Sequence, residues 1–293
     1  MNGAQKKQRL QAISESPSYI RAYEDVAFLQ RKDLRPIRLQ LELLKPELIL
    51  AEQGIRSTIV VFGGTRIVES SEARARVEHA KGRLKAEPGS RDAARELEVA
   101  KRVLAKSKYY DEAREFGRIV SSSCQTEGRC EYVVVTGGGP GVMEAANRGA
   151  FDEGGKSIGL NIVLQHEQAP NPYITPELCF QFHYFGLRKM HFLMRSVALV
   201  CFPGGFGTLD EMFEALTLIQ TGKSRRRPVL LFGRAFWTRL INFELLVETG
   251  MISALDLQLF RFVETAEEAW SVLEAEYGFE LREHDKDILP NEL

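Results

Sequence analysis

The chain has 293 residues, 44% of them hydrophobic, which is enough for one large α/β domain with additions or for two small domains. Its 39 basic and 40 acidic residues give a net charge of -1, so no overall field draws it to nucleic acid or to an anionic membrane. The N-terminal residues are polar and no apolar run approaches the length that spans a bilayer, so we expect a soluble protein without a membrane partner.

The N-terminal part of the chain, residues 1–55, looks helical and peripheral, with a leucine-rich stripe that suits packing on a larger body. The first clear strand covers 58–62 and ends in a glycine turn. This turn contains Gly63, Gly64 and Thr65.

Residues 68–107 differ in composition, being rich in alanine and in charged residues, with their main break at 87–90. This pattern predicts a helical hairpin whose second arm is capped by Ser90. Apolar residues recur at three- and four-residue spacing in each arm, which would allow the two arms to zip together. Two interpretations of the hairpin stay open. It lies over the site entrance or contacts a neighbouring subunit, or it is a two-helix projection that touches nothing functional.

A second strand and glycine turn follow the hairpin and its next helix, 109–120. Residues 132–136 form a buried apolar run, and Gly137, Gly138 and Gly139 begin the turn that leads into a helix. Further strands are predicted at 157–163, 197–202, 228–232 and 259–263, and further helices at 142–151, 186–196, 235–249 and 266–277, with a long loop at 165–176 and an aromatic run at 180–185.

Strands that alternate with helices predict a parallel sheet covered on both faces, that is, a Rossmann-like, doubly wound α/β fold. We expect one such domain over 56–280, carrying the hairpin as an insertion, with 1–55 as a helical N-terminal extension and 281–293 as an acidic tail.

The stretch that ends at Glu211 is the candidate active site. After the strand at 197–202 the chain turns at Pro203, and a helix opens with Gly207 and Thr208. Free backbone N–H groups at a helix start suit a phosphate or carboxylate. Gly204 and Gly205 can take positive φ and let a ligand approach the backbone without a Cβ in the way.

A structural interpretation of Glu211 has equal weight at this point. Thr208 and Glu211 have the spacing of a capping box, in which both side chains serve only the helix start.

The three glycine turns should meet at the carboxyl ends of neighbouring strands, where doubly wound sheets bind ligands. The dinucleotide fingerprint fails because Val142 stands at its third glycine, and a phosphate loop fails because Ala150 stands at its first. Neither NAD binding nor ATP hydrolysis is indicated, whereas a small phosphorylated ligand is.

Metal and thiol chemistry are not indicated. His183 and His191 have no third ligand at zinc spacing, so we expect no metal site. The four cysteines also lack such spacing, and we interpret them as reduced thiols of a cytoplasmic protein.

The segment 203–211 matches the Pro-Gly-Gly-x-Gly-Thr-x-x-Glu signature of the LOG ("lonely guy") family, and Arg188-Lys189 stand fifteen residues before it, where that family has an Arg-Lys pair. The chain therefore resembles the LOG phosphoribohydrolases, long labelled possible lysine decarboxylases, over roughly 56–280. Val197 and Phe192 depart from the smaller family members, which leaves base preference and oligomer contacts open.

The resemblance implies hydrolysis of the N-glycosidic bond of a purine nucleoside 5′-monophosphate, AMP or a cytokinin-type adenine nucleotide, without a cofactor. It implies Arg188 and Glu211 as the catalytic pair and a homodimer or larger homo-oligomer. By the same resemblance the 5′-phosphate would bind at Gly204, Gly205, Gly207 and Thr208, and the other two turns would flank ribose and base.

One alternative from another class is a non-catalytic nucleotide or molybdenum-cofactor carrier or sensor, since such carriers are similar to this family. A decarboxylase is disfavoured, because only Lys189 stands near the expected site as a candidate Schiff-base lysine.

Overall fold

The computed structural model describes residues 1–125, 130–163 and 169–278. The chain divides into two compact units, Met1–Lys45 and Pro46–Leu293, which we describe separately. The predicted acidic tail and part of the 165–176 loop lie outside the described residues.

The first unit is helical. It contains α1 (Gly3–Ser14), α2 (Val26–Leu29), two short 3-10 helices and the first part of α3 (Arg35–Glu52). Asn2 and Gln5 form a capping box at the start of α1, and no residue of α1 or α2 is buried.

The second unit is built on a seven-stranded parallel sheet, which confirms the predicted fold class. Its strands lie in the order β4-β3-β2-β1-β5-β6-β7, and all neighbouring pairs are parallel. The strands are β1 (Thr58–Phe62), β2 (Val133–Thr136), β3 (Ser157–Ile162), β4 (Cys179–Phe182), β5 (Ser196–Cys201), β6 (Val229–Phe232) and β7 (Arg261–Val263).

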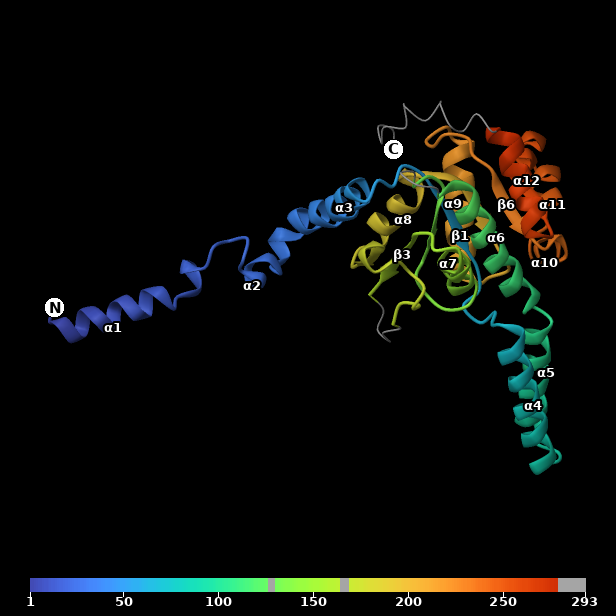
Figure 1. Ribbon diagram of the computed structural model, residues 1–293, viewed down its shortest axis with the longest axis horizontal. Helices are drawn as coiled ribbons and strands as arrows, with labels where there is room; N and C mark the ends of the chain where they lie inside the picture. The colour runs from blue at the N-terminus through green and yellow to red at the C-terminus, as the bar shows by residue number, and fades with distance from the viewer. Residues whose placement is uncertain (126–129, 164–168, 279–293) are drawn as a thin grey trace. The chain divides into compact units, whose positions relative to one another are not determined.

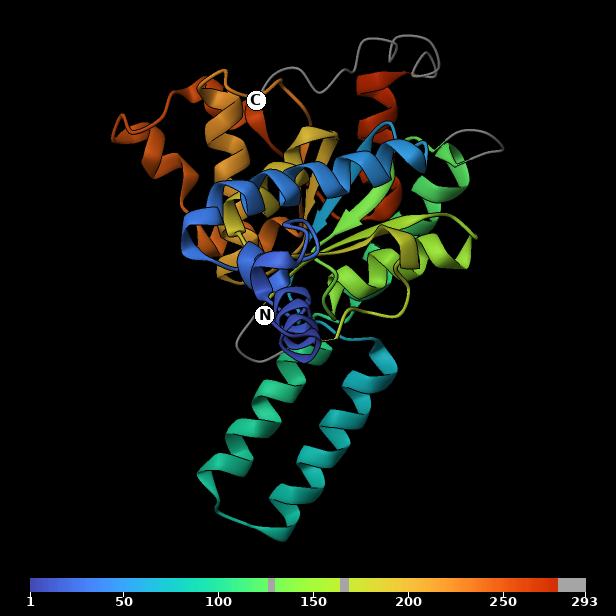
Figure 2. The same ribbon diagram turned by 90° about the vertical axis from the view of Figure 1, so that its left-hand side faces the viewer.

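Helices cover both faces of this sheet (Figures 1 and 2). The apolar cluster on one face includes Ile59 and Val61 of β1, and that on the other includes Val60 and Phe62. Three helices pack on the first cluster: α6 (Lys108–Cys124), α7 (Val142–Asp152) and α12 (Ala266–Tyr277). The end of α3 packs on the second cluster, together with α8 (Phe185–Met194), α9 (Phe206–Gln220), α10 (Arg234–Leu240) and α11 (Phe243–Glu248). Alternation along each strand therefore supplies both cores.

Three predicted elements differ from the structure. The aromatic run contains an additional edge strand, β4, whose half-buried, alternating side chains give a weaker signal than a fully buried run. The helix predicted at 235–249 is two helices, because Asn242 caps α11 by accepting a hydrogen bond from the Leu245 N–H at 3.1 Å. The last strand is only three residues long, since a 3-10 helix occupies Ala254–Leu259.

The hairpin is formed by α4 (Ser70–Ala86) and α5 (Arg91–Leu104), which pack on one another through Val77, Ala80 and Ala100. Ser90 caps α5 as predicted, accepting a hydrogen bond from the Ala93 N–H at 3.2 Å. The arms project away from the sheet (Figures 1 and 2).

Candidate functional site

The structure brings the three glycine turns together at the carboxyl ends of the strands. Strand β1 lies between β2 and β5, so the turns that follow these strands are neighbours. The Gly64 N–H donates to the Pro203 carbonyl at 3.0 Å, and the Val142 N–H donates to the Gly64 carbonyl at 3.3 Å. Backbone hydrogen bonds thus fix each turn against the next.

Close packing explains the glycine at the first turn. A Cβ on Gly63 would lie 2.5 Å from Val142 Cγ1, so a larger residue would separate β1 from the start of α7. Gly64 is half-buried and supplies backbone contacts, whereas Thr65 is exposed.

The central turn corrects the capping-box interpretation of Thr208 and Glu211. Helix α9 begins at Phe206 with Gly205 as its N-cap, so Thr208 and Glu211 lie inside the helix and form no capping box. Gly205 has φ -100°, and Gly204 is also outside the positive-φ region. Gly204 is instead required by proximity, because a Cβ there would collide with Thr208 Oγ1. The first turn of α9 at Gly205, Phe206 and Gly207 is exposed and open to a ligand.

Glu211 is buried, with 8% of its surface exposed, and its carboxylate accepts no hydrogen bond from the part of the chain that the structure describes. Burial raises the pKa of Glu211 to about 7, because a charge without water is unfavourable, and nearby Glu214 and Asp210 add to this effect. The cations Lys189 and Arg188 oppose it. A carboxyl group that titrates near neutrality is typical of proton-transfer chemistry.

Arg188, on α8, links strand β3 to the second glycine turn. Its Nε donates to the Leu160 carbonyl at 2.7 Å and its guanidinium contacts the Gly137 carbonyl at 3.4 Å. The guanidinium lies over the Phe192 ring, 5.2 Å from its centroid. Burial lowers the pKa of Arg188, which the charge of Glu211 opposes, and an arginine stays charged under such a shift.

Lys189 forms ion pairs with α9. Its Nζ lies 2.8 Å from Asp210 and 3.0 Å from Glu214, so it joins α8 to α9 beside Glu211. Burial alone would lower the pKa of Lys189, but hydrogen bonds to the two carboxylates outweigh that effect and raise it. Sequence reasoning did not identify Lys189, Asp210 and Glu214 as a group, because they belong to two different helices.

Asn171 is a further residue at the site that sequence reasoning missed. Its N–H donates to the Gly138 carbonyl at 2.9 Å, and its Nδ2 donates to the Gly139 carbonyl at 3.1 Å. The only signal was its place in the long loop at 165–176.

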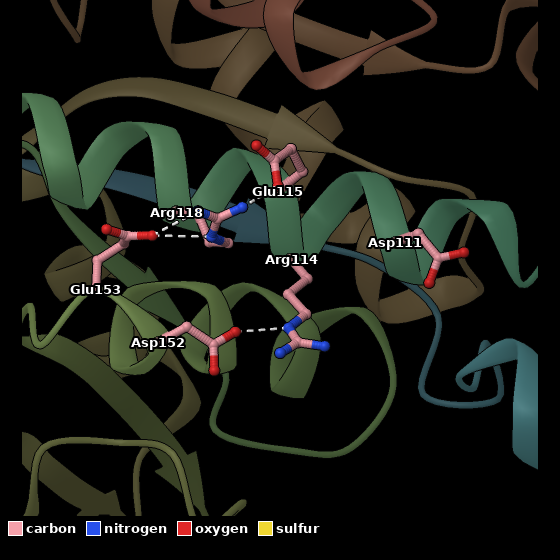
Figure 3. Close-up of a pocket in the computed structure, with 6 residues that line it drawn as sticks. All are labelled: Asp111, Arg114, Glu115, Arg118, Asp152 and Glu153. Carbon is pink, nitrogen blue, oxygen red and sulfur yellow. Dashed lines mark hydrogen bonds and ion pairs between the residues drawn. The ribbon is translucent and has the colours of Figure 1, made fainter.

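The surface has one hollow beside these residues and another away from them. A hollow of about 560 Å³ adjoins the outer face of α9 and is lined by Lys189, Phe206, Leu209, Asp210, Phe213, Glu214 and Thr217. Another of about 490 Å³ lies between α6 and α7 (Figure 3). There Arg114 pairs with Asp152 at 2.6 Å and Arg118 with Glu153 at 2.7 Å. The lining still has four acidic residues against two arginines, and no predicted site residue belongs to it.

Among the described residues, no group of three or more histidine, cysteine, aspartate or glutamate side chains could hold a metal ion. In the same part of the chain, no helix is both long and apolar enough to cross a membrane.

The doubly wound parallel sheet defines a Rossmann-like protein, with Arg188 and Glu211 beside its glycine turns. Residues 143–273 match the protein family described as "Possible lysine decarboxylase". The chain is 28% identical over 150 residues to the probable cytokinin riboside 5′-monophosphate phosphoribohydrolase LOGL3 of Oryza sativa subsp. japonica, covering 48% of this chain and 67% of that protein. It is 28% identical over 172 residues to the cytokinin riboside 5′-monophosphate phosphoribohydrolase LOG3 of Arabidopsis thaliana, covering 58% and 76%.

These matches confirm the resemblance to the LOG family that the motif at 203–211 predicts. Among solved structures, the Moco carrier protein from Chlamydomonas reinhardtii is 19% identical, with a TM-score of 0.43 over 75% of this chain and 97% of the carrier.

Proposed function

We propose that the protein hydrolyses the N-glycosidic bond of a purine nucleoside 5′-monophosphate, such as AMP or a cytokinin-type adenine nucleotide, to the free base and ribose 5-phosphate. The observation that carries the proposal is the placement of the buried Glu211 and the part-buried Arg188 at the glycine turns, in a chain similar to phosphoribohydrolases.

The 5′-phosphate would bind at the start of α9. Gly205 and Gly207 are exposed there, and the backbone N–H groups of the first turn have no partners within the helix. The positive end of the helix dipole adds to the attraction for a phosphate. A phosphate held at this point places the ribose of the nucleotide near Glu211, one turn further along the helix.

Glu211 would act on the sugar. Cleavage breaks the C1′–N bond, leaves its electron pair on the base and develops positive charge on the ribose. An ionised Glu211 stabilises that charge, and it can accept a proton from the water whose oxygen bonds to C1′. The base gains a proton as it leaves. Water is the only co-reactant, so the reaction requires no cofactor.

Arg188 would provide a fixed positive charge beside the reacting sugar and favour the ionised form of Glu211. Its two carbonyl contacts hold the guanidinium between β3 and the second glycine turn, where ribose and base are proposed to lie. We also propose that the protein acts in the cytoplasm as a homodimer or larger homo-oligomer.

The test is incubation of the purified protein with AMP, followed by chromatographic measurement of adenine and ribose 5-phosphate. A panel of purine and cytokinin nucleoside monophosphates ranks the bases, and Glu211→Gln serves as the matched control. Release of free base by wild type but not by the variant is expected. Binding of nucleotide without release of base from any member of the panel would contradict hydrolysis and favour a carrier or sensor.

A further inference from the structure

A buried polar network stands behind the second glycine turn. The Thr136 hydroxyl donates to Asn147 Oδ1 at 2.7 Å, and Asn171 Nδ2 donates to the same oxygen at 3.0 Å. Thr136 Oγ1 also accepts a hydrogen bond from the Gly138 N–H at 3.0 Å. Thr136 and Asn147 are 0% exposed and Asn171 is 7% exposed, so the network is shielded from water.

Asn171 occupies the centre of these contacts, although it comes from a different loop. Through its backbone and side chain it binds the carbonyls of Gly138 and Gly139, while Arg188 binds that of Gly137. Three successive carbonyls of the turn are therefore engaged by protein groups. Engaged carbonyls cannot rotate toward an anionic ligand, which they would repel.

The network also fixes an unusual backbone conformation. Gly138 has φ +74°, and its Cα lies against the carboxamide of Asn161, where no Cβ could fit. Buried polar groups of this kind are unfavourable unless their partners are present, so the satisfied network favours one arrangement of the turn over others.

We infer that Asn171 is a positioning residue for the reaction, because it holds the turn 137–139 and, through the Gly137 carbonyl, the guanidinium of Arg188. This inference rests on the proposed function only for its kinetic consequence. The hydrogen bonds that Asn171 makes to the turn, and their effect on its rigidity, do not depend on which ligand binds there.

The kinetic test compares Asn171→Ala and Asn171→Asp with wild type on AMP, each assayed well below its own thermal midpoint. Aspartate keeps the oxygen that accepts from the Tyr173 N–H but presents a second oxygen to two acceptors, the Gly139 carbonyl and Asn147. Both variants should lower kcat by about tenfold to a hundredfold, with KM changed less than about threefold, as expected when a catalytic group is misplaced.

Ser57→Ala is the matched control. Ser57 is also fully buried, and its Oγ accepts a hydrogen bond from the Tyr132 N–H at 3.0 Å. It lies just before β1, at the amino ends of the strands and so away from the glycine turns. It should lower the thermal midpoint without changing kcat. An equal loss of kcat in the control, or an unchanged kcat in Asn171→Ala, would overturn a positioning role.

Hydrogen exchange tests the inference without any turnover. In Asn171→Ala the Gly138 amide should exchange about tenfold faster or more than in wild type, while Ser57→Ala leaves it unchanged. If wild type does not cleave any nucleotide but this exchange difference is found, the proposed function fails and the positioning of the turn stands. Equal exchange in wild type and Asn171→Ala would overturn the inference even in an active enzyme.

Discussion

Replacing Glu211 with glutamine separates two effects of burying a carboxyl group, one on stability and one on catalysis. Glutamine has nearly the same shape but never ionises. Because Glu211 lies inside α9 and forms no capping box, the substitution removes no helix cap. The variant therefore reports on the charge alone.

The stability effect has a definite sign and size. The pKa of Glu211 rises from its ordinary value of 4.5 to about 7 in the fold, so the folded protein binds this proton more tightly than the unfolded chain. The resulting stabilisation is complete below about pH 4.5 and is lost as the pH rises through 7. Since one pKa unit corresponds to about 1.4 kcal/mol, the loss is about 3 kcal/mol above pH 7.

Glu211→Gln should accordingly be more stable than wild type at pH 8, by up to about 3 kcal/mol, and close to wild type at pH 4.5. Urea unfolding followed by tryptophan fluorescence measures this difference, because Trp237 is fully buried in the core. A variant that is less stable than wild type at pH 8, or a difference that does not vary with pH, would refute the assignment of a buried, destabilising charge.

The same variant should lose turnover on AMP by about two orders of magnitude or more, because it cannot stabilise the positive sugar. In wild type, kcat/KM should rise with pH and level off above about pH 7, as the free enzyme ionises Glu211. Full activity in Glu211→Gln would exclude an electrostatic role for this residue.

The other predictions concern Arg188, the glycine turn before α9, the 5′-phosphate of the substrate and the helical hairpin. Arg188→Lys should lower turnover about tenfold or more in steady-state assays, because an ammonium group cannot reproduce both carbonyl contacts of the guanidinium. Gly204→Ala should lower the free energy of unfolding by about 1 to 3 kcal/mol through its collision with Thr208; Gly205→Ala, with nothing within 4 Å, should lower it by less than about 1 kcal/mol, and equal losses would contradict this account. Adenosine should have a kcat/KM about a hundredfold below that of AMP, and equal values would exclude phosphate binding at α9. Replacing 72–105 with a short Gly-Ser linker should leave KM within about twofold, since the hairpin packs on itself; a larger change would assign it a role at the site.

Local signals were sufficient for much of the fold. The apolar runs of β1, β2 and β5 and the glycine turns after them are readable from a few residues each, and alternation with helices predicts their parallel arrangement. Strand β4 was missed because only one of its faces is buried.

The parts of the site that sequence reasoning missed depend on residues far apart in the chain. Asn171 binds the turn at 137–139, and no pattern in the sequence of its own loop indicates which segment it contacts. The capping-box interpretation of Glu211 failed for a different reason, because the N-cap of α9 is Gly205, three residues before Thr208. Spacing alone does not decide between a cap and a buried acid. The raised pKa of Glu211 depends on burial, which only the folded chain supplies.

The central position of β1 has a consequence for how the protein reaches its folded state. One side of β1 pairs with β2 and the other with β5, where Thr58 meets Ser196. Until β5 has been synthesised and docked, β1, with four apolar residues among its five, keeps an unpaired edge, which is prone to join other chains. Refolding yields should therefore fall steeply with protein concentration, and aggregation should compete with the step that brings β5 to β1, the same step that assembles the site.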